Sequence, residues 1–390
     1  MLNFLIGRAC TGKTYEIVKR VASDSAFGRV LLVVPEQFTF ETERSLIKFD
    51  NALLDNIDVL SFSRLYDEVL QKMGRGSTMC VSDFEKIVLL KKALKASSDN
   101  LKILKKFVDY SDFPETLYDT IRDLKFAGAS AEALQTAGRE IGGISGAKIC
   151  DLSLIMSAYD ALLTERYLDP ADALTKLYDL LCNFEYFKGK KVYFDSFSGF
   201  TGQQYKIIEK VIEQADEVNF SFCTDNPSNM DLGLFYNINT AIEKIKRIAR
   251  SRNVKIGEVK LFDKHFYSNE TMLALEGVMS SDKSTDNSLS NGFVNIISCE
   301  NPSDEALAAA NIISKEVSEN NYRFRDFILV ARDTSPYINS VKKQCVKNNI
   351  ACFMDESVSL TETPLYIFIK ALLGASKNFS TENKIGRAHV

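Results

Sequence analysis

The chain has 390 residues, of which 45% are hydrophobic and 26% charged, an ordinary composition for a soluble globular protein. This length exceeds one compact domain and favours two or three, each with its own core. The formal net charge of −4 excludes a protein drawn to nucleic acid by its overall charge. No run approaches the roughly 18 apolar residues of a membrane helix, and residues 2–6 are too short for a signal-peptide core. We therefore expect a cytoplasmic protein with no membrane partner.

Local clusters of charge and of metal-ligating residues are few. Residues 86–106 and 243–264 are rich in lysine and arginine, and either could lie along a phosphate backbone. The alternative is that each is a solvated helix face. The eight cysteines are scattered without a C-x-x-C pair, and His265 lies far from His389. We therefore expect buried thiols and no metal site built from these residues.

The first part of the chain alternates between apolar runs and a helical pattern. Residues 2–6, 29–34 and 59–62 have the pattern of short buried strands, and residues 14–21 have that of a helix. Strands separated by helices at this spacing predict a parallel sheet covered on both faces. We therefore assign residues 1–81 to the first part of an α/β domain.

From residue 82 the pattern becomes helical. Residues 84–94 carry apolar side chains at helical spacing, and another helix opens at Pro114. Residues 151–163 carry the clearest apolar stripe. Such stripes are packing surfaces, so we interpret residues 82–187 as a helical insertion in the α/β domain.

The strand pattern returns after the insertion. Residues 191–194 and 218–222 are apolar strands, and we assign residues 188–280 to the second part of the same domain. Residues 281–292 are rich in Ser, Asp and Asn without periodicity, which marks a linker.

A new βαβ pattern follows the linker. Strands at residues 293–298 and 327–331 flank a helix at residues 304–319. The pattern predicts the start of a second α/β domain over residues 293–384.

The first loop fits the pattern G-x-x-x-x-G-K-[ST] in full, with Gly7, Arg8, Ala9, Cys10, Thr11, Gly12, Lys13 and Thr14. The glycines let backbone N–H groups turn inward around phosphate oxygens, at the positive N-terminus of the following helix. We expect Lys13 to reach the β- and γ-phosphates and the Thr14 hydroxyl to hold Mg²⁺. The pattern therefore predicts a site for ATP and Mg²⁺, and the alternative is a loop that keeps its shape without a ligand.

Turnover of ATP needs a second acidic site. Residues 192–195 form an apolar strand that ends in Asp195, the candidate second Mg²⁺ ligand. The next residue is Ser196, where a glutamate that orients the attacking water would be expected. The alternative role of Asp195 is a turn or helix-capping carboxylate. We expect nucleotide binding without rapid hydrolysis and assign no catalytic residue.

Several segments together carry a family likeness. They are residues 6–14, 33–40 (VVPEQFTF), 59–65 (VLSFSRL), the helical pattern of 151–181 with Asp151, Tyr159, Asp169 and Asp172, and 195–201 (DSFSGFT). These segments resemble the N-terminal region of the AddB (RexB) family, the second subunit of the bacterial AddAB helicase–nuclease. The likeness continues to about residue 373, and the PEQ and DSFSGFT segments are its most specific parts.

The resemblance implies a RecA-like P-loop domain of superfamily 1 helicase type with a helical insertion, and then the start of a second RecA-like domain. In related helicases, the segments of Gln37 and Arg64 flank nucleotide or DNA, and we place Gln37 among the nucleotide-binding residues. Asp195 and Gln204 match the second helicase motif, whereas Ser196 departs from it. This departure agrees with a subunit that binds ATP and is not the motor.

The resemblance also implies partners. They are an AddA-type helicase–nuclease subunit in a heterodimer, and DNA, as single strands and as duplex ends. The implied role is the processing of double-strand breaks for homologous recombination, with recognition of a hotspot sequence.

Members of this family are far longer, with a nuclease domain and a 4Fe-4S cluster in the C-terminal part. We expect this chain to be an N-terminal fragment that holds neither. Residues 385–390 do not resemble the family, and we expect them to be non-native. Two positions inside the likeness depart from it: Cys10 replaces a usual Gly or Ser, and residues 355–360 are acidic where relatives are lysine-rich.

Three other interpretations remain open. The first is an active superfamily 1 DNA-dependent ATPase or helicase, and the second is a scaffold subunit that binds no nucleotide. The third is an unrelated P-loop kinase, which would need neither the PEQ segment nor the helical insertion.

Overall fold

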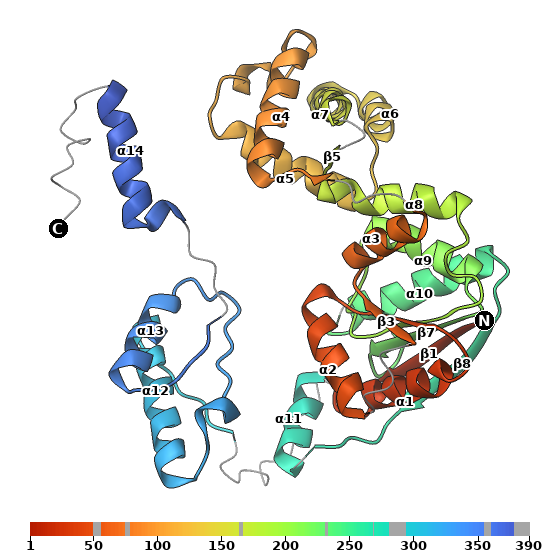
Figure 1. The fold of residues 1–390 in the computed structure, drawn as a ribbon, viewed down its shortest axis with the longest axis vertical. Helices are drawn as coiled ribbons and strands as arrows, with labels where there is room; N and C mark the ends of the chain where they lie inside the picture. Colours follow the sequence, from red (N-terminus) through yellow and green to blue (C-terminus); the bar gives the residue numbers. More distant parts are fainter. Residues whose placement is uncertain are drawn as a thin grey trace. The chain divides into compact units, whose positions relative to one another are not determined.

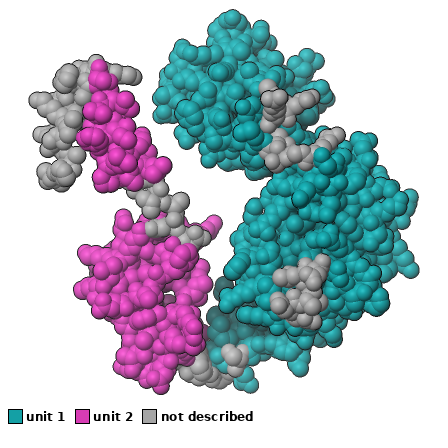
Figure 2. Space-filling model, viewed as in Figure 1, with its two compact units in different colours: residues 1–290 teal, residues 291–390 magenta. Residues whose placement is uncertain are grey.

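The computed structural model describes residues 1–49, 56–74, 79–163, 167–230, 233–267, 269–280, 294–354 and 360–377. The chain divides into two compact units, residues 1–290 (unit 1) and residues 291–390 (unit 2) (Figure 2). The division falls within the segment predicted as a linker, residues 281–292. That segment and residues 385–390 lie outside the described residues.

Unit 1 is built on a six-stranded sheet in which all neighbouring strands are parallel, in the order β3-β2-β6-β7-β1-β8 (Figure 1). The strands are β1 (Leu2–Gly7), β2 (Val30–Val33), β3 (Ile57–Leu60), β6 (Lys191–Phe194), β7 (Glu217–Cys223) and β8 (Ile256–Phe262). In the pairing of β1 with β7, Leu5 lies opposite Ser221 and Gly7 opposite Cys223. The predicted α/β class with a parallel sheet is confirmed.

Helices cover both faces of this sheet. One face carries α1 (Lys13–Ser25) and α2 (Thr39–Phe49), and the other carries α3 (Phe62–Lys72), α8 (Ala173–Asn183), α9 (Gly202–Gln214) and α10 (Tyr236–Ser251). Alternate residues of β1 enter the two layers, since Phe4 belongs to the core beneath α9 and α10 and Leu5 to the core beneath α1. Both side chains are fully buried, as the strand period of two requires for a covered sheet.

A set of helices between β3 and β6 has a hydrophobic core of its own. It comprises α4 (Asp83–Ser97), α5 (Phe113–Phe126), α6 (Ala131–Ile141) and α7 (Gly143–Leu162), with the short parallel pair β4 (Met79–Cys80) and β5 (Tyr167–Leu168). The predicted helices in this region are confirmed. The helix predicted at residues 151–163 begins earlier, at Gly143, because the glycines at its start hide the helical pattern.

Buried polar contacts fix this helical region. The Asp151 carboxylate accepts hydrogen bonds of 2.7–3.1 Å from the backbone N–H groups of residues 102–104. The Lys125 ammonium donates to Asp160 at 2.8 Å and to Asp172 at 2.6 Å. Burial alone would lower the pKa of Lys125, but the two carboxylates raise it above its usual value. The buried charges are therefore paired, as stability requires.

Two predictions for unit 1 need correction. The third strand was expected at residues 59–62 but ends at Leu60, because the Ser61 side chain accepts a hydrogen bond from Arg64 N and caps α3. The cysteines were expected to be buried, but four are exposed and four are partly exposed. The tendency of cysteine to be buried does not determine the exposure of a position that lies on a helix surface or in a loop.

In unit 2 the predicted helix is confirmed and the two predicted strands are wrong. The helices are α12 (Pro302–Glu319), α13 (Ile338–Lys347) and α14 (Pro364–Lys377). Residues 294–298 and 327–331 form no strand ladder, and Phe293 lies outside the described residues. Ile296 and Ile328 are 96% and 87% exposed, so neither side chain is covered as the side chains of a buried strand would be. A parallel strand exists only where a neighbouring strand pairs with it.

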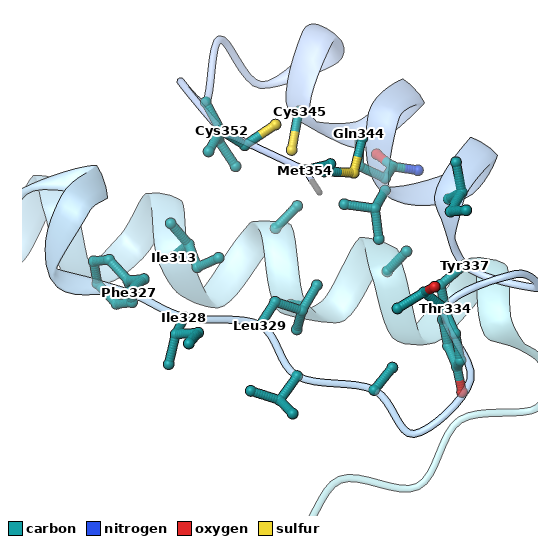
Figure 3. Close-up of a pocket in the computed structure, with 18 of the residues that line it drawn as sticks. Ile313, Phe327, Ile328, Leu329, Thr334, Tyr337, Gln344, Cys345, Cys352 and Met354 are labelled. Atoms are coloured by element: carbon teal, nitrogen blue, oxygen red, sulfur yellow. The ribbon is translucent and has the colours of Figure 1, made fainter. Parts of the chain in front are cut away.

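A cavity of 1210 Å³ lies between α12, α13 and the segments 324–334 and 350–354 (Figure 3). Its walls are mostly apolar side chains, among them Ile313 and Leu329. The walls are formed by the two helices and by the two extended segments. None of the helices in the described ranges has the length and apolarity needed to cross a membrane.

The junction between the helical region and the sheet gives a test of this fold. A Cβ atom at Gly202, the first residue of α9, would collide with the backbone oxygen of Ala127 at the end of α5. We expect Gly202→Ala to lower the free energy of unfolding by about 1–3 kcal/mol, the usual cost of overpacking. Gly199→Ala is the control, because a Cβ atom there meets nothing within 4 Å. Urea unfolding followed by circular dichroism measures both, and equal midpoints would contradict the tight junction.

Candidate phosphate-binding site

The loop of residues 7–14 joins buried strand β1 to helix α1 with an unusual backbone. Gly12 precedes α1 with a φ of 84°, and Cys10 has a φ of 55°. Both lie in the left-handed region, where glycine is favoured and other residues are uncommon. Left-handed residues within a turn leave successive N–H groups facing one concavity, an arrangement that binds anions.

Gly7 is required by close contacts at the end of β1. A Cβ atom there would lie 2.6 Å from Thr11 Oγ1 and 2.7 Å from the backbone oxygen of Phe262. The Thr11 hydroxyl is buried and donates to the carbonyl of Arg8 at 2.8 Å. The start of the loop is thus closed tightly against β8.

Lys13 folds back over the loop. Its ammonium donates to the carbonyl of Arg8 at 2.6 Å. Burial lowers the pKa of Lys13, while negative charge at Cys223, at Asp195 and at Cys10 would raise it. The ammonium therefore lies in a partly desolvated position near Asp195, where an anion would stabilise its charged form.

The remaining donors of the loop are suited to phosphate. Within the described residues, the backbone N–H groups of Ala9, Cys10 and Gly12 donate to no other protein group. Thr14, in the first turn of α1, is exposed. Free N–H groups, a helix N-terminus and a lysine together match the chemistry of a phosphate chain. The residues present therefore fit a bound nucleotide.

Asp195 directly follows β6 and is 5% exposed. One carboxylate oxygen accepts from the hydroxyl of Ser196 at 3.3 Å, and the other accepts from that of Ser221. Ser221 lies on β7, the strand between β6 and β1. Ser196 is exposed and has a φ of 65°. The structure therefore holds Asp195 with two hydroxyl groups, and the next residue, Ser196, carries no carboxylate.

Gln37 lies apart from this loop. It is an exposed residue of the short 3₁₀ helix Glu36–Phe38, which follows β2. Strands β6 and β7 separate β2 from β1, which at the usual strand spacing is about 14 Å. The Glu36 carboxylate accepts from the Ser63 hydroxyl at 2.8 Å, so the PEQ and SFSRL segments meet each other there. A nucleotide contact for Gln37 stays a prediction.

Sequence reasoning missed the segment that follows β8. His265 and Phe266 contact the carbonyls of Ala9 and Cys10, and Glu276 of α11 (Glu270–Ser280) pairs with Arg8. The three consecutive aromatic residues at positions 265–267 could have indicated a contact segment. They follow β8, whose sequence has no clear apolar alternation, so neither the strand nor the segment after it was predicted.

The cavity of unit 2 has two cysteines on its wall. Cys345 and Cys352 lie next to each other on its wall (Figure 3). Burial and a hydrogen bond with Cys352 raise the pKa of Cys345 to about 11. This thiol is therefore protonated at neutral pH and is a poor nucleophile. Among the described residues, no group of three or more His, Cys, Asp or Glu side chains is placed to hold a metal ion.

The fold and the loop define an α/β protein in which a G-x-x-x-x-G-K-[ST] segment joins a buried strand of a parallel sheet to a helix. The family model described as "ADDB, N-terminal" matches residues 4–276, which is more than half of the chain. The chain therefore belongs to the AddB N-terminal family, and the resemblance of its segments is confirmed.

The curated relatives share one name, that of the B-type subunit of an ATP-dependent helicase/deoxyribonuclease. The protein of Clostridium novyi (strain NT) is 29% identical over 387 residues, which cover 95% of this chain and 34% of that protein. The protein of Thermoanaerobacter sp. (strain X514) is 29% identical over 395 residues, 98% of this chain and 34% of its own length. That of Bacillus anthracis is 27% identical over 391 residues, 95% of this chain and 33% of its own length. The chain thus spans about a third of the length of the curated relatives it matches.

The contact between Ser221 and Asp195 can be tested by substitution. We expect Ser221→Ala to destabilise unit 1 by about 1–3 kcal/mol, because a buried carboxylate loses a donor. Ser198→Ala, at an exposed position of the adjacent loop, should change stability little. Chemical unfolding of the two variants at neutral pH makes the comparison, and an unchanged Ser221→Ala variant would show that the hydroxyl does not support Asp195.

Proposed function

We propose that unit 1 is a RecA-like nucleotide-binding domain of superfamily 1 helicase type, that it binds Mg²⁺–ATP at residues 7–14, and that unit 2 begins a second such domain. The observation that carries the proposal is the backbone of the loop. Left-handed residues at positions 10 and 12, free N–H groups and Lys13 meet at the start of α1. Each of these features favours a phosphate chain.

Thr14 and Asp195 are the residues that would hold Mg²⁺. Magnesium commonly takes one or two protein ligands and completes its shell with phosphate oxygens and water. When bound, the ion would neutralise charge on the phosphates. Ser221 and Ser196 would orient the Asp195 carboxylate for this contact.

ATP bound here would not drive a motor. Rapid hydrolysis needs a group that positions water, and Ser196 stands where a glutamate would be expected. The Ser196 hydroxyl donates to Asp195, and a serine hydroxyl is no base for an attacking water. Binding with slow turnover follows from these features.

The whole protein would be the AddB-type subunit of a cytoplasmic heterodimeric helicase–nuclease that processes DNA double-strand breaks and recognises a hotspot sequence. The family and the name of the relatives support this role. Its partners would be an AddA-type helicase–nuclease subunit and DNA. A nuclease domain and a 4Fe-4S cluster would belong to the part of the relatives that this chain does not span.

Equilibrium binding of a fluorescent ATP analogue with Mg²⁺ tests the proposal, with phosphate release followed in the same samples. We expect micromolar binding that is lost in Lys13→Ala, because the ammonium compensates phosphate charge. Lys19→Ala, at an exposed position of the same helix, should bind as the parent does.

Phosphate release should stay slow with and without single-stranded DNA. DNA-stimulated release that depends on Lys13 would instead make the subunit a motor. No binding by a folded chain would leave the role of a scaffold.

A further inference from the structure

Three consecutive residues of the 7–14 loop are each held by the chain that follows β8. Arg8 Nε donates to Glu276 Oε1 at 2.8 Å, and Arg8 Nη2 donates to Glu276 Oε2. The Ala9 carbonyl accepts from His265 Nδ1 at 3.1 Å, in the tautomer that carries the proton there. The Cys10 carbonyl accepts from Phe266 N at 2.8 Å. We call residues 263–267 together with α11 the clasp.

The clasp holds the outer side of the loop. In a turn whose N–H groups face a common concavity, the carbonyl groups point away from it. The clasp binds two of these carbonyls, while the N–H groups of the same residues, Ala9 and Cys10, remain free. The Phe266 ring covers the left-handed corner, since its Cε2 lies 3.3 Å from the place of a Cβ atom at Gly12. The clasp thus supports the backbone shape that an anion needs and leaves the donors available.

The docking of α11 depends on polar contact more than on hydrophobic packing. No residue of this helix is buried, and its Met272, Leu273 and Leu275 side chains are between a third and a half exposed. The Arg8–Glu276 pair is better protected, with side-chain exposures of 22% and 14%. A bidentate, partly buried ion pair is among the stronger polar contacts of a protein. A helix with no buried residue is therefore attached to unit 1 in part through the loop itself.

We propose that Glu276 is a positioning residue for the nucleotide site: by holding Arg8, it keeps the 7–14 loop in its anion-binding shape, and nucleotide binding in turn stabilises the docking of α11. The inference rests on the proposed nucleotide site. The two effects are one coupling free energy, so each must appear if the other does. Within the described residues α11 is the last helix of unit 1, so this coupling would place a nucleotide-dependent contact near the C-terminal end of that unit.

The test uses the full chain and the variant Glu276→Gln, which keeps the shape of the side chain and removes its charge. We expect the dissociation constant for the fluorescent Mg²⁺–ATP analogue to rise about fivefold or more, the lower range of such couplings. Glu270→Gln is the matched control, because Glu270 is an exposed residue of the same helix. Its affinity should equal that of the parent.

Amide hydrogen exchange distinguishes this coupling from a merely structural role of Glu276, because a structural role predicts no nucleotide-dependent change of exchange in α11. Adding the Mg²⁺–ATP analogue should slow exchange in residues 270–280 of the parent and of Glu270→Gln, but not of Glu276→Gln at the same occupancy. Equal or tighter binding by Glu276→Gln, or no change of exchange in a parent chain that binds nucleotide, overturns the inference and leaves the nucleotide site intact. A parent chain that binds no nucleotide overturns both.

Discussion

A parallel strand cannot pair with the segment that directly follows it, and this constraint organises unit 1. β1 is flanked by β7 and β8, which come from the other end of the unit. The terminal ammonium of Met1 donates to the Asp216 carbonyl at 2.9 Å, and Leu2 N donates to the Lys255 carbonyl at 3.0 Å. Contacts that shape the 7–14 loop therefore come from the chain beyond the helical region, which pairs with β1. Its tight closure against Phe262 and its clasp are consequences of that pairing.

The same constraint explains why unit 2 differs from its sequence pattern. Residues 327–331 (FILVA) have the composition of a buried strand. The helices α12 and α13 are of the kind that would cover such a strand. Strand structure nevertheless depends on neighbours in space, and in the described residues of unit 2 these segments have no ladder partner. The cavity and the exposure of Ile328 are two aspects of this unpaired arrangement.

Sequence reasoning succeeded where local signals and the fold agree. Within unit 1, the apolar strands, the helices with clear stripes and the loop motif are local patterns, and each lies where it was expected, apart from shifted ends. The errors and omissions depend on distant contacts. The end of β3 is an exception, because the Ser61 cap contacts Arg64 N only three residues further along the chain. For Asp195, the Ser221 hydroxyl that contacts it comes from a different strand, β7. The contact of Glu276 with Arg8 joins positions that no periodicity relates.

A nucleotide site without a group to activate water acts through binding free energy alone. Occupancy can then change the protein only if a contact is stronger in one conformation than in the other. In the proposed site the inner side of the 7–14 loop would face the nucleotide, and the outer side would carry any contact that differs between conformations. There the carbonyls of Ala9 and Cys10 and the guanidinium of Arg8 meet a segment with little hydrophobic packing. A weakly packed helix held by the rim of a ligand site can convert binding free energy into docking, and α11 would be that helix in unit 1 if the proposed nucleotide site is correct.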